Sequence, residues 1–158
     1  MPYADLPGVR LWYEDSGGTG PPVVFLHAFS GTSQSWVHQV PAFARAGYRC
    51  LAPDRREWGR STLNPASPIT RTDTEDLDAL VNLLRLERLH LVATAAGAVT
   101  GFDYALTHPE RVRSLVVANT VGGVQDEAYI EVQHRLRPAE IQALPVFLRE
   151  LSAGYRGP

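Results

Sequence analysis

The sequence contains no lysine, one cysteine and one methionine, and it has no long hydrophobic run. Its single cysteine, Cys50, can form neither an intrachain disulfide nor a zinc cluster of thiolates. No apolar stretch approaches the roughly 18 residues of a transmembrane helix. The N-terminus lacks the basic and apolar regions of a secretory signal. These absences predict a cytoplasmic protein that makes no use of membranes or disulfides.

The charge balance gives no reason to expect a polyanionic partner. All 15 basic residues are arginines, and 17 acidic residues bring the net charge to −2. Without a positive excess there is no electrostatic case for nucleic acid or an anionic membrane. The five histidines show no metal-ligand spacing with a carboxylate partner. We therefore expect no metal, no cofactor and no nucleic acid.

Apolar runs and helical periodicities alternate through the first 118 residues, apart from a long polar loop over 54–70. Strands are predicted at 9–15, 23–26, 48–52, 89–93 and 112–118, and helices at 36–46, 72–84 and 98–108. Thr72 is the expected N-cap of the second helix, with Glu75 at the capping-box position. Strands alternating with helices predict an α/β fold with a doubly wound, mostly parallel sheet.

The pattern changes after Asn119. A glycine-containing loop is followed by two segments of helical character, 125–136 and 138–152, with Pro138 in the first turn of the second. We therefore divide the chain into residues 1–120, a sheet-containing part, and 121–158, the start of a helical part. A parallel sheet of so few strands would expose a long apolar edge. This predicts that the sequence is part of a longer chain.

Residues 89–98 are the most informative stretch. An apolar run, 89–92, leads into a turn whose alternate positions, Ala93, Ala95 and Gly97, are all small, and a helix follows. This stretch resembles the nucleophile elbow of α/β-hydrolases, Gly-x-Ser-x-Gly, in which a strained turn lifts the nucleophile above the sheet. Ala95 stands at the nucleophile position and has neither a hydroxyl nor a thiol. A plain tight turn that needs small residues is the alternative interpretation.

Two further stretches carry the same resemblance in the expected order. Residues 23–31, Val-Val-Phe-Leu-His-Ala-Phe-Ser-Gly, are similar to the strand and oxyanion loop of the family. Residues 54–61, Asp-Arg-Arg-Glu-Trp-Gly-Arg-Ser, resemble its Asp-x-Arg-Gly-x-Gly-x-Ser loop. Together with the passage 104–112 that follows the elbow, they imply a cap-containing α/β-hydrolase fold over residues 3–120, incomplete here, with the cap beginning at 121. The sequence departs from the family pattern at Ala28 and Glu57, both usually glycine, and at Ala95.

The resemblance also implies site residues. The backbone N–H groups of Ala96 and Phe29, or less readily Ala28, are the expected oxyanion-hole donors, and His27 is expected to brace their loop. Alanine at position 95 does not remove backbone donors, and the N-terminus of the following helix favours developing negative charge. Ser30 and Trp58 are the candidate substrate contacts.

The implied activity is hydrolysis of an ester, an amide or a carbon–carbon bond in a small organic substrate. Because a serine hydrolase needs a nucleophile, a base and an orienting acid, Ala95 leaves three alternatives open. The serine was replaced, naturally or by engineering; or the protein runs serine-independent lyase or oxygenase chemistry; or it binds a ligand without turnover. By resemblance, the acid and the catalytic histidine lie beyond residue 158.

Overall fold

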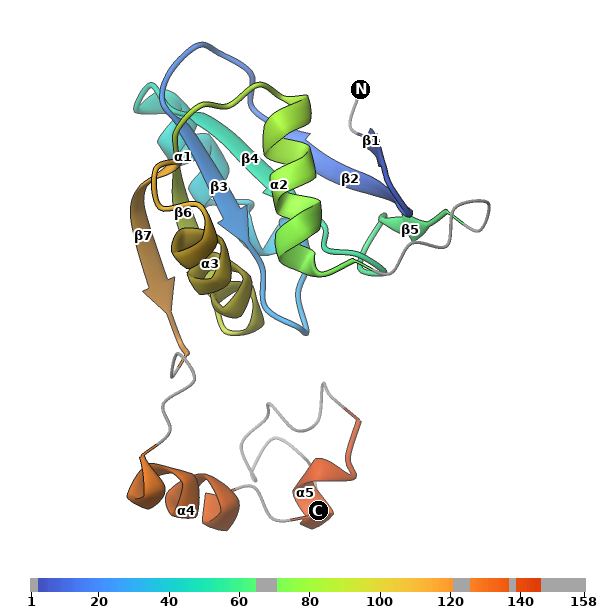
Figure 1. The fold of residues 1–158 in the computed structure, drawn as a ribbon, viewed down its shortest axis with the longest axis vertical. Helices are drawn as coiled ribbons and strands as arrows, with labels where there is room; N and C mark the ends of the chain where they lie inside the picture. Colours follow the sequence, from blue (N-terminus) through green and yellow to red (C-terminus); the bar gives the residue numbers. More distant parts are fainter. Residues whose placement is uncertain (1–2, 65–70, 121–125, 137–138, 146–158) are drawn as a thin grey trace. The chain divides into compact units, whose positions relative to one another are not determined.

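The computed structural model describes residues 3–64, 71–120, 126–136 and 139–145. Contacts divide the chain into two compact units, Met1–Gly122 and Gly123–Pro158. The first unit contains the sheet, and the described residues of the second contain two helices (Figure 1).

The sheet of the first unit is mixed, with parallel strands at its centre. Its strands follow the order β1 (Tyr3–Leu6), β2 (Val9–Asp15), β4 (Arg49–Pro53), β3 (Pro22–Leu26), β6 (Leu89–Thr94) and β7 (Val112–Ala118), while β5 (Thr62–Leu63) pairs with β2. The strands β4, β3, β6 and β7 are parallel neighbours. The strands β1 and β5 and the β2–β4 pairing are antiparallel. The predicted mostly parallel α/β sheet is confirmed.

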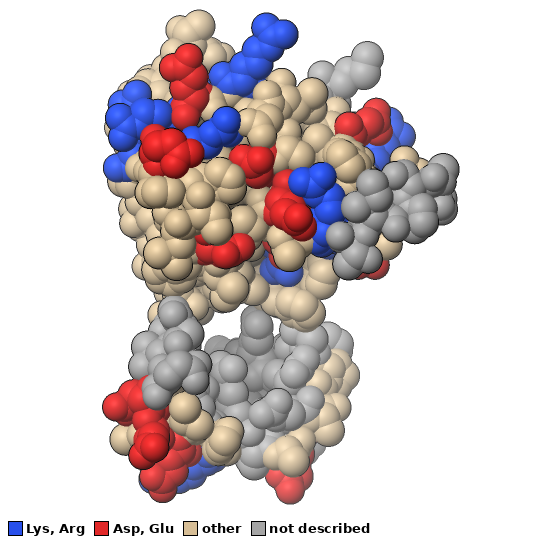
Figure 2. Space-filling model, viewed as in Figure 1, with Lys and Arg blue, Asp and Glu red and all other residues tan. Residues whose placement is uncertain are grey.

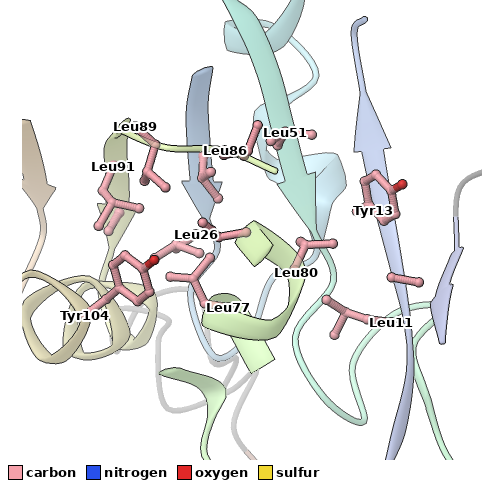
Figure 3. Packing of buried hydrophobic residues seen from close by; sticks show 14 of the residues in the cluster. Leu11, Tyr13, Leu26, Leu51, Leu77, Leu80, Leu86, Leu89, Leu91 and Tyr104 are labelled. Atoms are coloured by element: carbon pink, nitrogen blue, oxygen red, sulfur yellow. The ribbon is translucent and has the colours of Figure 1, made fainter. Parts of the chain in front are cut away.

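Alternation along the central strands supplies a separate core on each face of the sheet. In β3, Val24 and Leu26 belong to the cluster under α2 (Asp73–Leu83) and α3 (Ala96–Thr107). Figure 3 shows this cluster, with leucines of strands and helices converging between the two layers. Val23 and Phe25 pack on the opposite face, with residues of η1 (Ser33–Trp36) and α1 (Gln39–Arg45). Strands buried on both faces explain the continuous apolar runs in the sequence.

The ends of α2 have clear sequence causes. The side chain of Thr72 accepts the N–H of Glu75, and the Glu75 carboxylate accepts the N–H of Thr72, which completes the predicted capping box. At the other end, Arg85 has a φ of 54°. The N–H groups of Arg85 and Leu86 donate to the carbonyls of Asn82 and Val81, as in a Schellman motif.

Several predicted boundaries were wrong. The helix expected over 36–46 is replaced by η1 and by α1, which begins only at Gln39. The helix expected from residue 98 begins at Ala96. The strands β1 and β5 were missed. The predicted loop 54–70 contains β5, because pairing with the edge of β2 stabilises two residues that carry no strand pattern of their own.

The second unit contains α4 (Glu127–Leu136) and α5 (Ala139–Gln142). The Asp126 carboxylate accepts the N–H of Tyr129, so Asp126 caps the start of α4. The helix predicted over 138–152 ends at Gln142 within the described residues, and Pro138 and its last part, 146–152, lie outside them. In the described ranges, no helix has the length and apolar character needed to cross a bilayer.

Candidate functional site

The turn between β6 and α3 keeps an elbow conformation although its apex is alanine. Ala95 has φ 47° and ψ −115°, outside the regions that residues with a Cβ ordinarily adopt. Its N–H donates to the carbonyl of Ala118 on β7 at 3.1 Å, and its carbonyl accepts the N–H of Ala98 at 3.0 Å. Hydrogen bonds to β7 and to α3 therefore hold Ala95 in its strained conformation.

Gly97 explains how the elbow is fixed against β3. A Cβ at this position would overlap the carbonyl oxygen of Leu26 and lie 2.7 Å from that of His27. The start of α3 therefore touches the backbone at the end of β3, and only glycine fits there. This contact brings the elbow beside the stretch 27–31. Ala96 is the first residue of α3, so its N–H has no intrahelical acceptor.

Residues 27–31 form a tight turn held by His27. The N–H of Gly31 donates to the carbonyl of Ala28 at 3.0 Å. Nε2 of the buried His27 accepts the N–H of Arg55 at 2.9 Å, so Nδ1 carries the proton and donates to Ala28 at 2.7 Å. Burial lowers the pKa of His27 below 6.5, only partly offset by the Ala28 carbonyl. A neutral imidazole thus links the turn to the loop at 55.

Asp54 organises the loop 54–61. Its carboxylate is fully buried and accepts the N–H groups of Ser33 at 2.7 Å and Arg60 at 2.9 Å. Its backbone carbonyl accepts the hydroxyl of Ser61, which in turn accepts the N–H of Trp12. The loop is therefore anchored both to β2 and to η1.

Two positions in this loop have special backbone requirements. A Cβ on Gly59 would overlap the Asp54 carboxylate, and Gly59 has a φ of 56°. Glu57 has a φ of 64°, which explains why glycine is usual at this position in the resembling pattern. In this chain Glu57 adopts the positive φ although its side chain has a Cβ.

Aromatic side chains join the loop to the turn. The indole N–H of Trp58 donates to the carbonyl of Phe29, and the two rings pack edge to face at 4.8 Å. The Arg55 guanidinium lies 4.8 Å from the Trp58 ring and 5.8 Å from the Phe29 ring. The structure thus brings together Trp58, Phe29, Ala28 and His27.

Ion pairs tie the same loop to α2. Arg56 forms a two-point contact with Asp76 through Nε at 2.9 Å and Nη2 at 2.8 Å. Burial raises the pKa of Asp76, and Arg56 opposes that rise. Arg55 meets Asp73 through Nε alone, at 2.9 Å. These pairings join residues 18 and 20 positions apart and were not predicted from the sequence.

Apart from His27, the histidines described in the first unit have partners away from the elbow or lie on the surface. His90 bonds to Ser114, and His108 contacts Thr107 and Asp78. His38 is exposed at the start of α1. Ser30 lies exposed in the turn and has an interaction partner of its own. Over the described residues, no three histidine, cysteine or carboxylate side chains cluster as a metal site.

The comparisons with known proteins agree with this geometry. A family model described as the alpha/beta hydrolase fold matches residues 21–153. The chain belongs to the α/β-hydrolase-fold family.

Proteins similar to this chain have names that indicate different activities. Epoxide hydrolase A of Mycobacterium tuberculosis is 40% identical over 116 residues, 70% of this chain and 35% of that protein. A protein of the same organism named as a non-heme bromoperoxidase, BpoC, is 38% identical over 115 residues, 72% and 43% of the two chains. A solved structure of a Vigna radiata epoxide hydrolase variant has a TM-score of 0.69 at 29% identity, covering 84% of this chain and 43% of that one. The chain spans less than half the length of each.

Proposed function

We propose that this chain forms the elbow-bearing part of a hydrolase-type site for a small organic substrate, with Ala95 at the nucleophile's position. The reaction class is hydrolysis of an ester, an amide or a carbon–carbon bond. The observation that carries this proposal is the conformation of Ala95. A strained backbone of this kind costs about 1–3 kcal/mol and persists where the surrounding structure over-determines it. In an elbow, that conformation presents the apex and the next N–H to a substrate.

The donors that fit such a substrate are backbone N–H groups. Ala96 supplies one from the first turn of α3, and Phe29 supplies the other from the turn held by His27, with Ala28 as the alternative. Their role is to stabilise negative charge that develops on a substrate oxygen. We assign substrate contacts to Ser30 and Trp58, and a cap to residues 121–158. The reaction needs no cofactor, and we place it in the cytoplasm.

Ala95 limits what this site does as it stands. Without a hydroxyl or thiol at the apex, no acyl-enzyme forms. Two alternatives follow from the same geometry. A serine-independent lyase or oxygenase uses the oxygen-binding donors with a base elsewhere. A binding protein keeps the pocket without turnover. The fold alone does not choose among them.

The deciding experiment restores the nucleophile. Ala95→Ser is incubated with 4-nitrophenyl acetate, and the intact mass is followed for an acetyl adduct. Ala46→Ser, an exposed alanine with an ordinary backbone after α1, is the matched control. An adduct on Ala95→Ser alone supports the hydrolase proposal. In a form of the protein that also holds the catalytic histidine and acid, a well-folded Ala95→Ser variant that never acquires the adduct overturns it.

The alternatives have their own readouts. A lyase or oxygenase turns its substrate over with Ala95 in place, and Ala95→Gly leaves that rate unchanged. A binder shows a saturable, ligand-dependent rise in Tm while the ligand is recovered intact. Because two of the compared proteins are named epoxide hydrolases, an epoxide belongs beside esters, amides and ketones in the substrate panel.

A further inference from the structure

The end of β7 carries a polar side chain beside the elbow that lies outside the predicted site residues. Asn119 follows Ala118, whose carbonyl oxygen accepts the N–H of Ala95 at 3.1 Å. A carbonyl oxygen lies about 2.8 Å from the Cα of the next residue. The Cα of Asn119 is therefore within about 6 Å of the Ala95 nitrogen, and its carboxamide nitrogen reaches roughly 3.5 Å beyond that Cα. This side chain is long enough to contact an atom held over Ala95.

The backbone and the exposure of Asn119 both set it apart. Its φ is 54°, a conformation that is uncommon for residues with a Cβ and that is concentrated at functional sites. Arg85 has the same φ, but the motif that ends α2 accounts for it. Asn119 instead follows a strand, is exposed, and has no side-chain hydrogen bond to the described residues. Its carboxamide is therefore available to a ligand.

The strand order places Asn119 across the elbow from the turn 27–31. Strand β6 lies between β3 and β7 and is parallel to both (Figure 1). The turn 27–31 follows β3, Ala95 follows β6 and Asn119 follows β7, so all three lie at the carboxyl end of the parallel strands. The proposed backbone donor of Phe29 lies on the β3 side of the apex. Asn119 supplies a polar group on the β7 side.

The chemistry of a carboxamide indicates what kind of atom it would contact. The group carries two N–H donors and no charge, so it donates to an oxygen without adding a charge that must be balanced. Its bond to an oxygen strengthens when negative charge develops there. On the face shown in Figure 2, basic and acidic side chains are interspersed over the first unit, so no patch of one sign there indicates an ionic ligand. An oxygen acceptor of a neutral substrate fits these observations.

We propose that Asn119 is a substrate-contacting residue of the elbow site, and that its carboxamide N–H donates to a substrate oxygen held over Ala95 on the β7 side. The inference rests on the proposed function, because the ligand of Asn119 is the substrate of the elbow. It adds a side-chain donor to a site whose other proposed donors, at Ala96 and Phe29, are backbone N–H groups.

The test places an anionic acceptor at the apex of the whole chain. Ala95→Cys introduces a thiol there, and the pH profile of its alkylation by iodoacetamide gives the pKa of that thiol. Peptide mapping separates this thiol from the buried Cys50. A hydrogen bond to the thiolate lowers the pKa. Adding Asn119→Gly is therefore expected to raise the pKa of the introduced thiol by about 0.5–1. Glycine adopts a positive φ without strain, so the backbone at position 119 is retained.

The matched control is Arg85→Gly in the same Ala95→Cys background. Arg85 is exposed and has the same φ of 54°, but it precedes β6, whose length separates it from the elbow by about 20 Å, beyond the screening length of salt. The pKa of the introduced thiol is expected to stay unchanged. An equal rise in both variants overturns the inference, and so does a pKa that Asn119→Gly leaves unchanged.

A second substitution separates donation from proximity. Asn119→Asp keeps the shape of the side chain and replaces the donor by a carboxylate, so it is expected to raise the pKa of the introduced thiol further than Asn119→Gly does. A rise with aspartate but not with glycine means that the side chain lies near the apex without donating, which contradicts the proposal. A thiol that iodoacetamide never alkylates would show that the apex is closed to a ligand, and this outcome overturns it as well.

The failure of this inference can be told from that of the proposed function. Alkylation of the introduced thiol needs neither a catalytic histidine nor an acid, whereas the acetylation test of Ala95→Ser needs both and leaves Asn119 unaltered. An unaffected thiol pKa together with acetylation removes only Asn119 from the site. A raised pKa without acetylation leaves Asn119 beside the apex and removes the hydrolase reaction.

Discussion

The elbow and the loop 54–61 each hold a non-glycine residue at a positive φ, but they do so through different contacts. Each has a strained non-glycine residue, Ala95 or Glu57, two positions before a glycine that has no room for a Cβ. In the elbow, Gly97 meets the backbone oxygens of Leu26, at the end of β3, and of His27, which follows it. In the loop, Gly59 meets the carboxylate of Asp54. The glycine of the elbow is therefore confined by main-chain atoms, whereas the glycine of the loop is confined by a side chain.

This comparison indicates at which positions the backbone allows only one type of residue. The glycines are fixed by space, whereas the strained positions tolerate an alanine and a glutamate at a cost in free energy. A change at position 95 therefore removes chemistry without removing geometry. Substitutions at Gly97, Asp54, His27 and Glu57 test this account, in decreasing order of expected effect.

Gly97→Ala is expected to have the largest effect. The new methyl group meets the carbonyl oxygen of Leu26, the last residue of β3, and that of His27, which follows it, and main-chain atoms at a sheet strand have little freedom to move. We expect a loss of about 4 kcal/mol or more in the free energy of unfolding, measured in urea. The control is Gly101→Ala in the same helix, where the nearest atoms are side-chain carbons of Leu115 and Ala93 at 3.1 and 3.3 Å. Equal losses in the two variants would refute the backbone contact.

Asp54→Asn tests whether one side chain holds the loop. Asparagine keeps a single acceptor oxygen, so one of the N–H groups of Ser33 and Arg60 loses its bond inside the protein. We expect a loss of about 2–4 kcal/mol in urea unfolding. Asp103→Asn, at an exposed position of α3, is the control. A loss below about 1 kcal/mol would show that the other anchors of the loop, such as Ser61 and the Arg56–Asp76 pair, hold it without the Asp54 carboxylate.

His27 connects the two regions and predicts a pH dependence. Its folded-state pKa is lower than 6.5, so below pH 6.5 the unfolded chain takes up a proton that folded His27 resists. Its contribution to stability is fully present above pH 6.5 and falls as the pH drops toward the folded pKa. His27→Gln is expected to flatten the slope of unfolding free energy between pH 6.5 and 5.

The control for this slope is His38→Gln, which removes an exposed imidazole. If both variants flatten the slope equally, or neither does, the burial of His27 is not the cause.

Glu57→Gly is expected to have the smallest effect and the opposite sign. Relieving a positive φ gains about 1–2 kcal/mol, and the added freedom of the unfolded chain offsets part of it. The net expectation is a gain of up to about 1 kcal/mol in thermal or urea unfolding. Glu87→Gly, whose φ is not positive, should lose stability. A loss at both positions would mean that Glu57 has compensating contacts.

Local rules predicted most of the first unit. The apolar runs located the central strands, and the capping box located the start of α2 to the residue. Helix α3 was placed two residues late, because Ala96 and Gly97 belong to a turn whose geometry is set by contact with β3. The strands β1 and β5 escaped prediction because they exist through pairing with β2 and not through a pattern of their own.

The spacing of motifs in the sequence predicted the candidate site residues. Their side-chain contacts could be read only from the structure. The order of the three motifs indicated Ala95, His27 and Phe29 as neighbours of one site. Nothing in the sequence indicated that Arg55 would be left with a single bond to Asp73, or that Trp58 would donate to Phe29. Such partners are chosen by the fold after distant segments meet.

The thiol of Cys50 reports how often the sheet around β4 opens to solvent. It lies fully buried on β4 beside Val23 of β3, and burial raises its pKa. A thiol reagent therefore reacts only when this face of the sheet separates. Because this sequence has no second cysteine, the rate of labelling reports those openings at a single site, without an added probe.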